Sequence, residues 1–144
     1  MTDLSLNMGC GPYDRMEALR YGHVSPDGIT LNFHAVGNPH HIFARMVATQ
    51  EFDVSEMSAS LYLTQRGRGI FPFIAIPVFP SRVFRHGNIY INRNSGIESP
   101  KDLEGKRIGL QEYRQTAAVW IRGILRDEYG VDTDSIEWAE GGTN

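Results

Sequence analysis

The 144-residue chain has a single cysteine, Cys10, so it forms no internal disulfide bond. A lone thiol suits a reducing compartment. The amino terminus also lacks the positive charge and the unbroken apolar run of a secretory signal peptide. We therefore expect a cytoplasmic protein.

Long apolar runs and an excess of basic charge are missing as well. The longest strongly apolar stretch, residues 70–79, contains two prolines and is far shorter than the roughly 20 residues that span a bilayer. The net charge is −3, from 14 basic and 17 acidic residues, so there is no basic face to neutralise a nucleic-acid backbone. We expect neither a membrane nor a nucleic-acid partner, and the sequence leaves a homo-oligomer open.

Motifs that bind nucleotides or metal ions are also missing from the sequence. The turn Gly9-Cys10-Gly11 lacks the third glycine of a dinucleotide loop, and no phosphate-loop motif is present. His40 and His41 are adjacent, and neighbouring helical residues point about 100° apart, which does not suit one shared zinc ion. The sequence predicts no cofactor and no metal ligand, and it leaves open a divalent ion that bridges substrate hydroxyls.

The residues that are present describe an ordinary globular domain, with 41% hydrophobic and 22% charged residues. Short segments with strand-like alternation are followed by segments with helical spacing, and Asn38-Pro39 and Ser99-Pro100 have the cap-plus-proline pattern of a helix start. We expect strands at 4–8, 29–33, 52–55, 73–76, 88–92, 106–110 and 135–138, and helices at 13–21, 39–49, 58–65, 99–103 and 116–129.

This order of strands and helices predicts an α/β protein with mostly parallel sheets and flanking helices. The apolar run 73–76, bounded by prolines, is typical of a strand buried on both faces. A change in composition near 93–100 predicts a first lobe over 1–95 and the start of a second over 96–144. Ligands of such sheets bind beyond the carboxyl ends of the strands, so we expect the site in the loops 9–15, 56–60, 77–86 and 111–116.

Several segments carry a resemblance to a known family. Residues 53–58, 76–86, 112–113 and 116–123 are similar to the 4,5-dihydroxyphthalate decarboxylase family, and residues 99–109 resemble the entry to the second lobe of type 2 periplasmic-binding-protein-like (NMT1/THI5-like) folds. The resemblance implies a two-lobed protein that removes a carboxyl group from a dihydroxylated aromatic dicarboxylate, as a carboxy-lyase of aromatic degradation. Members of that family are longer, so the chain resembles an N-terminal portion with an incomplete second lobe.

The family also has relatives among the solute-binding proteins of transporters. The alternative is therefore a non-catalytic protein that captures a small anionic ligand for an ABC-type transporter. Such a protein would bind the anion with the same residues and would not convert it.

Three residues after the apolar run are the catalytic candidates. Guanidinium groups bind carboxylates through two parallel hydrogen bonds, so we expect Arg82 and Arg85 to hold the substrate. His86 is the expected proton donor, since histidine titrates near neutral pH. A surface ion pair for either arginine, or a structural role for the histidine, is the alternative. Residues three apart face opposite sides of a strand, so both arginines serve only if Pro80-Ser81 opens a loop.

The other substrate-binding candidates also lie in loops that follow strands. Tyr113 to Thr116 leads into a helix whose free N–H groups suit an anion, although Thr116 is equally a simple helix cap. Glu56 would accept a phenol proton or be a solvated charge, and Cys10 lacks the paired base of a nucleophile. The full set is Tyr13, Glu56, Ser58, Ser81, Tyr113, Gln115 and Thr116.

Overall fold

The computed structural model describes residues 4–142 and divides into two compact units. Unit 1 comprises Met1–Ser58 and Pro72–Arg82, and unit 2 comprises Ala59–Phe71 and Val83–Asn144. The chain therefore enters unit 2, returns to unit 1 and leaves it again after Arg82. Each unit is described by itself below, and the lobe boundary expected at 95/96 stays a prediction.

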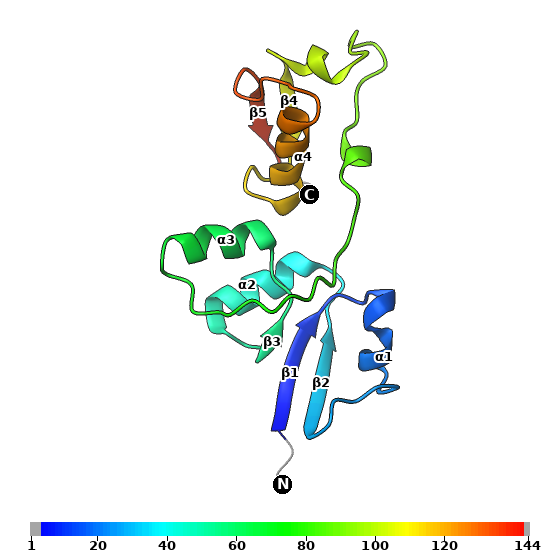
Figure 1. Ribbon diagram of the computed structural model, residues 1–144, viewed down its shortest axis with the longest axis vertical. Coiled ribbons are helices and arrows are strands. Elements are labelled where there is room, and N and C mark those ends of the chain that lie inside the picture. Colours follow the sequence, from blue (N-terminus) through cyan, green and yellow to red (C-terminus); the bar gives the residue numbers. More distant parts are fainter. Residues whose placement is uncertain (1–3, 143–144) are drawn as a thin grey trace. The chain divides into compact units, whose positions relative to one another are not determined.

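Unit 1 contains a parallel sheet of β1 (Leu4–Cys10), β2 (Ile29–Ala35) and β3 (Val54–Ser55), in the order β2-β1-β3 (Figure 1). In the long pair, Leu4 lies opposite Ile29 and Cys10 opposite Ala35. The 3-10 helix η1 (Asp14–Met16) and α1 (Glu17–Arg20) connect β1 to β2, and α2 (Pro39–Thr49) connects β2 to β3. The central position of β1 brings the loop after it next to the loop after β3.

Local signals set the bounds of α2. Asn38 accepts a hydrogen bond from the backbone N–H of His40 at 3.0 Å, and Pro39 takes the first helical position. Gln50 ends the helix in a left-handed conformation, with φ of 51°. The buried face of α2, through Ile42 and Met46, packs with Phe52 into one core cluster. A second cluster consists of Met8, Cys10 and Met16.

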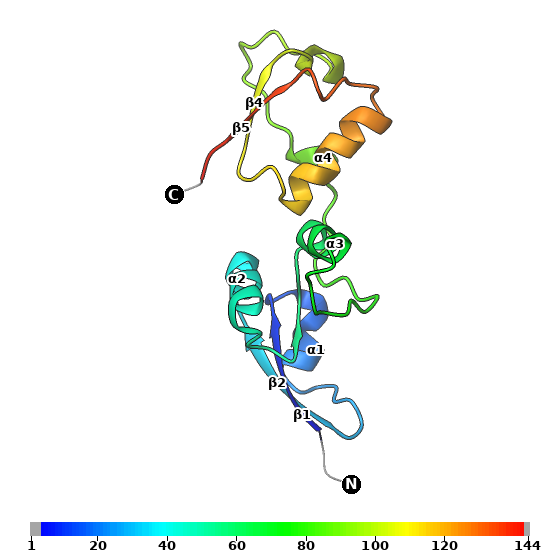
Figure 2. The same cartoon turned by 90° about the vertical axis from the view of Figure 1, so that its left-hand side faces the viewer.

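Unit 2 contains α3 (Ala59–Gly67), η2 (His86–Asn88), η3 (Pro100–Leu103), β4 (Arg107–Leu110), α4 (Thr116–Asp127) and β5 (Glu137–Glu140). The strands β4 and β5 form a parallel pair, and Figure 2 shows α4 beside them as the crossover between the two. The core cluster is Leu103, Leu125, Val131 and Ile136. Unit 2 thus repeats the strand-helix-strand arrangement of unit 1 with its own core.

Most expected elements are confirmed, with shifted ends. The helix expected at 13–21 is η1 followed by α1, the helix at 99–103 is the 3-10 helix η3, the strand at 52–55 shortens to β3, and the strand at 135–138 moves to Glu137–Glu140. The α/β class and the parallel pairing are confirmed. No helix within 4–142 combines the length and the apolar character that crossing a bilayer requires.

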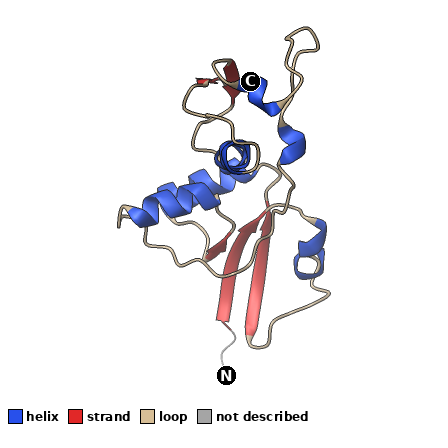
Figure 3. Ribbon diagram, turned by 45° about the horizontal axis from the view of Figure 1, so that its top comes forward, coloured by secondary structure: helices blue, strands red, loops and turns tan. Residues whose placement is uncertain are grey.

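Two expected strands are wrong. Residues 73–76 and 88–92 lie in the long loop region between α3 and β4, which Figure 3 shows in tan, interrupted by η2 and η3. Ile74 is 85% exposed and Tyr90 is 88% exposed, so neither segment is a buried central strand. Pro72 and Pro77 remove ladder donors at both ends of the first segment, and no described strand pairs with it. The η2 helix occupies the start of the second segment.

Candidate functional site

The side chain of Glu56 ties the loop after β3 to the loop after β1 in unit 1. Its backbone N–H donates to the Gly9 carbonyl at 3.0 Å. The Oε1 atom accepts from the Gly11 N–H at 2.7 Å, and Oε2 accepts from the Tyr13 hydroxyl at 2.9 Å. Glu56 is only 8% exposed, so it is a buried, hydrogen-bonded carboxylate and not a solvated charge.

Two glycines allow this close approach. A Cβ atom on Gly11 would lie 2.8 Å from the Tyr13 ring, and one on Gly9 would lie 2.7 Å from the Phe52 ring. Both distances are well below van der Waals contact. The glycines at the end of β1 and directly after it are thus required by the two aromatic rings packed against them.

Burial and the Glu56 charge keep two neighbouring groups protonated. Burial raises the pKa of the Cys10 thiol to about 12, and the negative Glu56 adds to the effect. Burial also raises the pKa of Tyr13 to about 12, together with its hydrogen bond to Glu56, while the nearby Ser81 hydroxyl acts in the opposite direction. Tyr13, Glu56 and Ser81, all expected to bind substrate, therefore lie together, and we name them the Glu56 cluster.

Arg15 is a cation beside this cluster that the sequence did not single out for the site. Its Nη1 donates to the Pro80 carbonyl, and its Nη2 lies 3.4 Å from Asp14 Oδ1. The guanidinium carbon is 5.7 Å from the centre of the Tyr13 ring. The available signal was its position two residues after Tyr13 in the same loop.

Tyr113 is the centre of a second arrangement, in unit 2. Its backbone N–H donates to Glu140 Oε1 at 2.5 Å, and its carbonyl accepts from Arg122 Nη1 at 2.8 Å. The Arg122 guanidinium carbon lies 3.7 Å from the Tyr113 ring centre, and the Trp138 ring is 6.4 Å away in an edge-to-face arrangement. Sequence reasoning missed Arg122 and Trp138, because nothing local links either residue to Tyr113.

The start of α4 is tied to the start of α3 within the same unit. Thr116 Oγ1 accepts from the Ser60 backbone N–H at 3.3 Å and lies 3.1 Å from its hydroxyl, which donates to the Arg114 carbonyl at 2.6 Å. Gln115 occupies the N-cap position without a side-chain cap, and its amide donates to Gln111 at 3.2 Å. A substrate role for Gln115 and Thr116 stays a prediction, as it does for Ser58, which directly precedes α3.

The three catalytic candidates fall in different units. Arg82, in unit 1, donates through Nε to the Phe79 carbonyl at 3.2 Å. Arg85 and His86 belong to unit 2, where Arg85 precedes η2 and His86 Nε2 lies 3.0 Å from Glu128 Oε2. Residues 77–85 form a loop and not a strand, so the alternation of a strand does not turn Arg82 and Arg85 to opposite sides. Their joint role stays a prediction.

A shallow cavity lies at the carboxyl ends of β4 and β5, with a volume of about 460 Å³. Its lining consists of Gly109, Leu110, Gln111, Ala139, Glu140 and Gly141. Across residues 4–142, no group of three or more His, Cys, Asp or Glu side chains is arranged to hold a metal ion.

Comparison with known proteins places the chain in a family. It is 46% identical over 142 residues to a protein of Comamonas testosteroni named 4,5-dihydroxyphthalate decarboxylase, covering 99% of this chain and 43% of the relative. A Pseudomonas putida protein of the same name is 42% identical over 142 residues, covering 99% of this chain and 55% of the relative. The chain thus spans about half the length of the curated relatives it matches. The model of the family described as NMT1/THI5 like matches residues 27–144, and the chain belongs to that family.

Proposed function

We propose that the protein is a carboxy-lyase that decarboxylates a dihydroxylated aromatic dicarboxylate such as 4,5-dihydroxyphthalate, in the degradation of aromatic compounds. The observation that carries the proposal is the near-complete alignment of this chain with two proteins named for that reaction. The Glu56 cluster supports it, because a buried carboxylate, a phenol and a hydroxyl are groups that recognise a hydroxylated ring.

The reaction needs a proton donor and anion holders, and no nucleophile. A ring hydroxyl ortho or para to the reacting carbon allows that carbon to be protonated first, which gives a ketone-like ring. The bond to the carboxylate then breaks, carbon dioxide leaves, and the bonding electron pair restores the aromatic ring. The proton taken up stays on the ring carbon.

We assign the roles as the sequence suggested them. Arg82 and Arg85 would hold the carboxylates, and His86 would supply the proton. Since His86 Nε2 already contacts Glu128, it would use Nδ1 or give up that contact to reach the ring. Tyr113, Gln115 and Thr116 keep their expected role in substrate binding.

Location and partners complete the proposal. We propose a cytoplasmic enzyme, because Cys10 is a free thiol and suits a reducing compartment. Its partner is the small aromatic anion, with neither nucleic acid nor membrane. The protein would need no cofactor for the steps above, and a divalent ion on the substrate hydroxyls stays open.

The test follows carbon dioxide release and thermal stability together. The 144-residue chain is incubated with 4,5-dihydroxyphthalate and with unsubstituted phthalate. We expect carbon dioxide from the dihydroxylated compound alone. Stabilisation without carbon dioxide would overturn the enzyme and support the solute-binding alternative.

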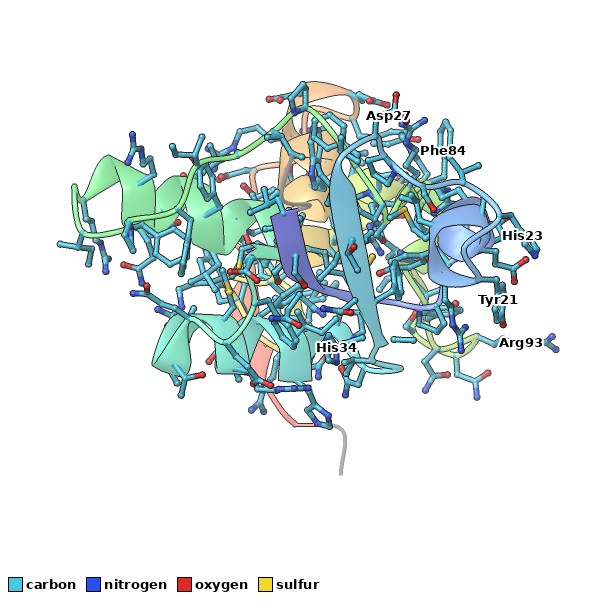
Figure 4. All side chains as sticks on the ribbon, turned by 90° about the horizontal axis from the view of Figure 1, so that it is seen from below. Tyr21, His23, Asp27, His34, Phe84 and Arg93 are labelled. Carbon is cyan, nitrogen blue, oxygen red and sulfur yellow. The ribbon has the colours of Figure 1, made fainter. Side chains whose placement is uncertain are left out.

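Arginine variants test the anion holders. Replacing Arg82 or Arg85 with leucine removes charge-assisted hydrogen bonds and should weaken dicarboxylate binding by about 1.5–3 kcal/mol. Arg93→Leu is the control, because Arg93 is exposed and Figure 4 shows its side chain projecting at the periphery of unit 2. Calorimetric titration measures the affinities, and equal affinities for all four proteins would remove both arginines from the site.

A further inference from the structure

Within the Glu56 cluster, the pair formed by Glu56 and Tyr13 meets a ligand only as an acceptor of hydrogen bonds. A carboxylate only accepts hydrogen bonds, and a tyrosine has one proton to donate. That proton is already committed, since Tyr13 donates it to Glu56 at 2.9 Å. The Tyr13 oxygen therefore keeps its lone pairs, while its proton points inward.

Burial and the fixed loop hold the Tyr13 proton on Glu56. Glu56 is 8% exposed and is held from the other side by the Gly11 N–H at 2.7 Å. The Tyr13 ring packs on Gly11 so closely that no Cβ atom fits between them. Tyr13 is half-buried and Ser81 is exposed, so both side chains are partly open at the surface of unit 1. These contacts leave the direction of the hydrogen bond from Tyr13 to Glu56 little freedom to reverse.

We propose that the Glu56 cluster is the subsite for the ring hydroxyls of the substrate, and that it discriminates against carboxylates. A ring hydroxyl donates to the free lone pairs of the Tyr13 oxygen. A carboxylate in the same place would find no donor in Tyr13 or Glu56 and would face the negative charge of Glu56. The inference deepens the proposed function and rests on it, because it assigns one edge of the substrate to unit 1.

Arg15 does not change this assignment. Its guanidinium group is directed at the Pro80 carbonyl and the Asp14 carboxylate, so its charge is partly compensated within the same loop. The substrate carboxylates would then be held by other cations, as proposed for Arg82 and Arg85. In this arrangement Glu56 acts through Tyr13 and Gly11 and is a positioning residue.

The test measures how strongly the protein prefers 4,5-dihydroxyphthalate over phthalate, which has the same two carboxylates without the hydroxyls. The ratio of the two dissociation constants is determined by calorimetry. Tyr13→Phe removes one acceptor and should lower this preference about fivefold, which is the contribution of one hydrogen bond. Ser81→Ala removes a hydroxyl that both donates and accepts, in an exposed loop where folding is not at risk, and should lower the preference less.

Glu56→Gln gives the sharper result, because it reverses the polarity without removing volume. The new amide accepts from the Gly11 N–H through its oxygen and donates to Tyr13, so the Tyr13 proton is released towards the ligand. We expect weaker binding of 4,5-dihydroxyphthalate and tighter binding of phthalate, with the preference lowered about tenfold. A residue that only supports the fold would weaken both ligands alike. The controls are Glu17→Gln and Tyr21→Phe, on exposed side chains of the same unit. Figure 4 labels Tyr21.

The outcomes are distinct. An unchanged preference in Tyr13→Phe, Ser81→Ala and Glu56→Gln, or a selective loss of phthalate binding, would overturn the hydroxyl subsite even if carbon dioxide is still released. If the preference changes as expected but neither the wild type nor any variant releases carbon dioxide, the result supports the hydroxyl subsite and overturns the decarboxylase. If neither aromatic compound binds, the hydroxyl subsite and the decarboxylase are both overturned.

Discussion

Each unit places a tyrosine in the loop after its first strand, but the two surroundings differ. In unit 1 the Tyr13 hydroxyl is bound to a buried carboxylate, and burial together with that contact raises the pKa of the phenol to about 12. In unit 2 the Tyr113 ring, not its hydroxyl, makes the main contact, with Arg122 at 3.7 Å from its centre. Tyr113 is 43% exposed. Unit 1 thus fixes the direction of a hydrogen bond, whereas unit 2 fixes a flat aromatic and cationic surface.

Together with the proposed function, this difference predicts that the two units have different roles in binding. A committed hydroxyl proton distinguishes donors from acceptors, which gives chemical selectivity. A guanidinium stacked on tyrosine offers charge and ring area to any aromatic anion, which gives affinity with less selectivity. The following predictions test whether the two units are as separate, and as different, as this comparison requires.

The largest effects should come from the two cores. Leu125→Ala in unit 2 and Ile42→Ala in unit 1 each remove a fully buried side chain and should cost about 2–5 kcal/mol. Trp120 and Trp138 both lie in unit 2, and the only cysteine, buried Cys10, lies in unit 1. Tryptophan fluorescence in urea and the rate of Cys10 labelling by a thiol reagent therefore report on different units.

We expect each core variant to change mainly the signal of its own unit. Leu125→Ala should lower the urea midpoint seen by fluorescence, and Ile42→Ala should accelerate Cys10 labelling. If Ile42→Ala lowers the fluorescence midpoint as much as Leu125→Ala does, the two units unfold as one, and the comparison between them loses its basis.

A matched pair of glycines should give the next largest effect. Gly9 in β1 and Gly109 in β4 both lie in parallel strands, but an added Cβ atom meets the Phe52 ring at 2.7 Å in the first case and nothing within 4 Å in the second. Gly9→Ala should cost about 1–3 kcal/mol by overpacking. Gly109→Ala should be neutral or slightly stabilising. Equal urea midpoints for the two variants would show that Phe52 moves aside at little cost.

The sequence predicted those parts of the molecule that depend on neighbouring residues. The cap at Asn38-Pro39 sets the start of α2 because its hydrogen bond is local, and α4 lies within the predicted range 116–129 and ends at Asp127. The apolar run 73–76 was wrongly predicted as a buried strand, because a strand also needs a neighbouring strand to pair with, and apolar residues alone do not provide one. Only the structure provides that information.

The candidate site shows the same limit. The rule that ligands bind beyond strand ends selected the loops of Tyr13 and Glu56, which are 43 residues apart in the chain and in contact in the fold. The direction of the hydrogen bond between them needed the fold, because it depends on the burial of Glu56. The contact of Arg122 with Tyr113 has no local signature, so residue types alone did not identify it.

A smaller effect should appear at alkaline pH and depend on unit 1. The ordinary pKa values of Cys10 and Tyr13 are 9.0 and 10.0, and the folded chain raises both to about 12. Between pH 9 and 12 the unfolded chain loses these protons while the folded chain keeps them, so stability falls as pH rises. Tyr13→Phe should flatten this loss in urea midpoints followed by circular dichroism at pH 8 and 10, and Tyr21→Phe should not. An equal slope in both variants would contradict the assignment to Tyr13.

The smallest effect should appear at acid pH and depend on unit 2. Hydrogen bonds from the backbone N–H groups of Glu98 and Ser99 and from the Ser99 hydroxyl lower the pKa of Asp102. A lowered pKa gives stability that is present above the ordinary value of 3.8 and is lost as pH falls through the folded value. Asp102→Asn should therefore reduce the fluorescence midpoint at pH 7 slightly and make it less dependent on pH between 2 and 5, while the exposed Glu98→Gln leaves the profile unchanged. Because Asp102 is fully exposed, solvent screens its interactions, so a shift as large as that of Gly9→Ala would mean that η3 supports the unit 2 core more strongly than its surface position implies.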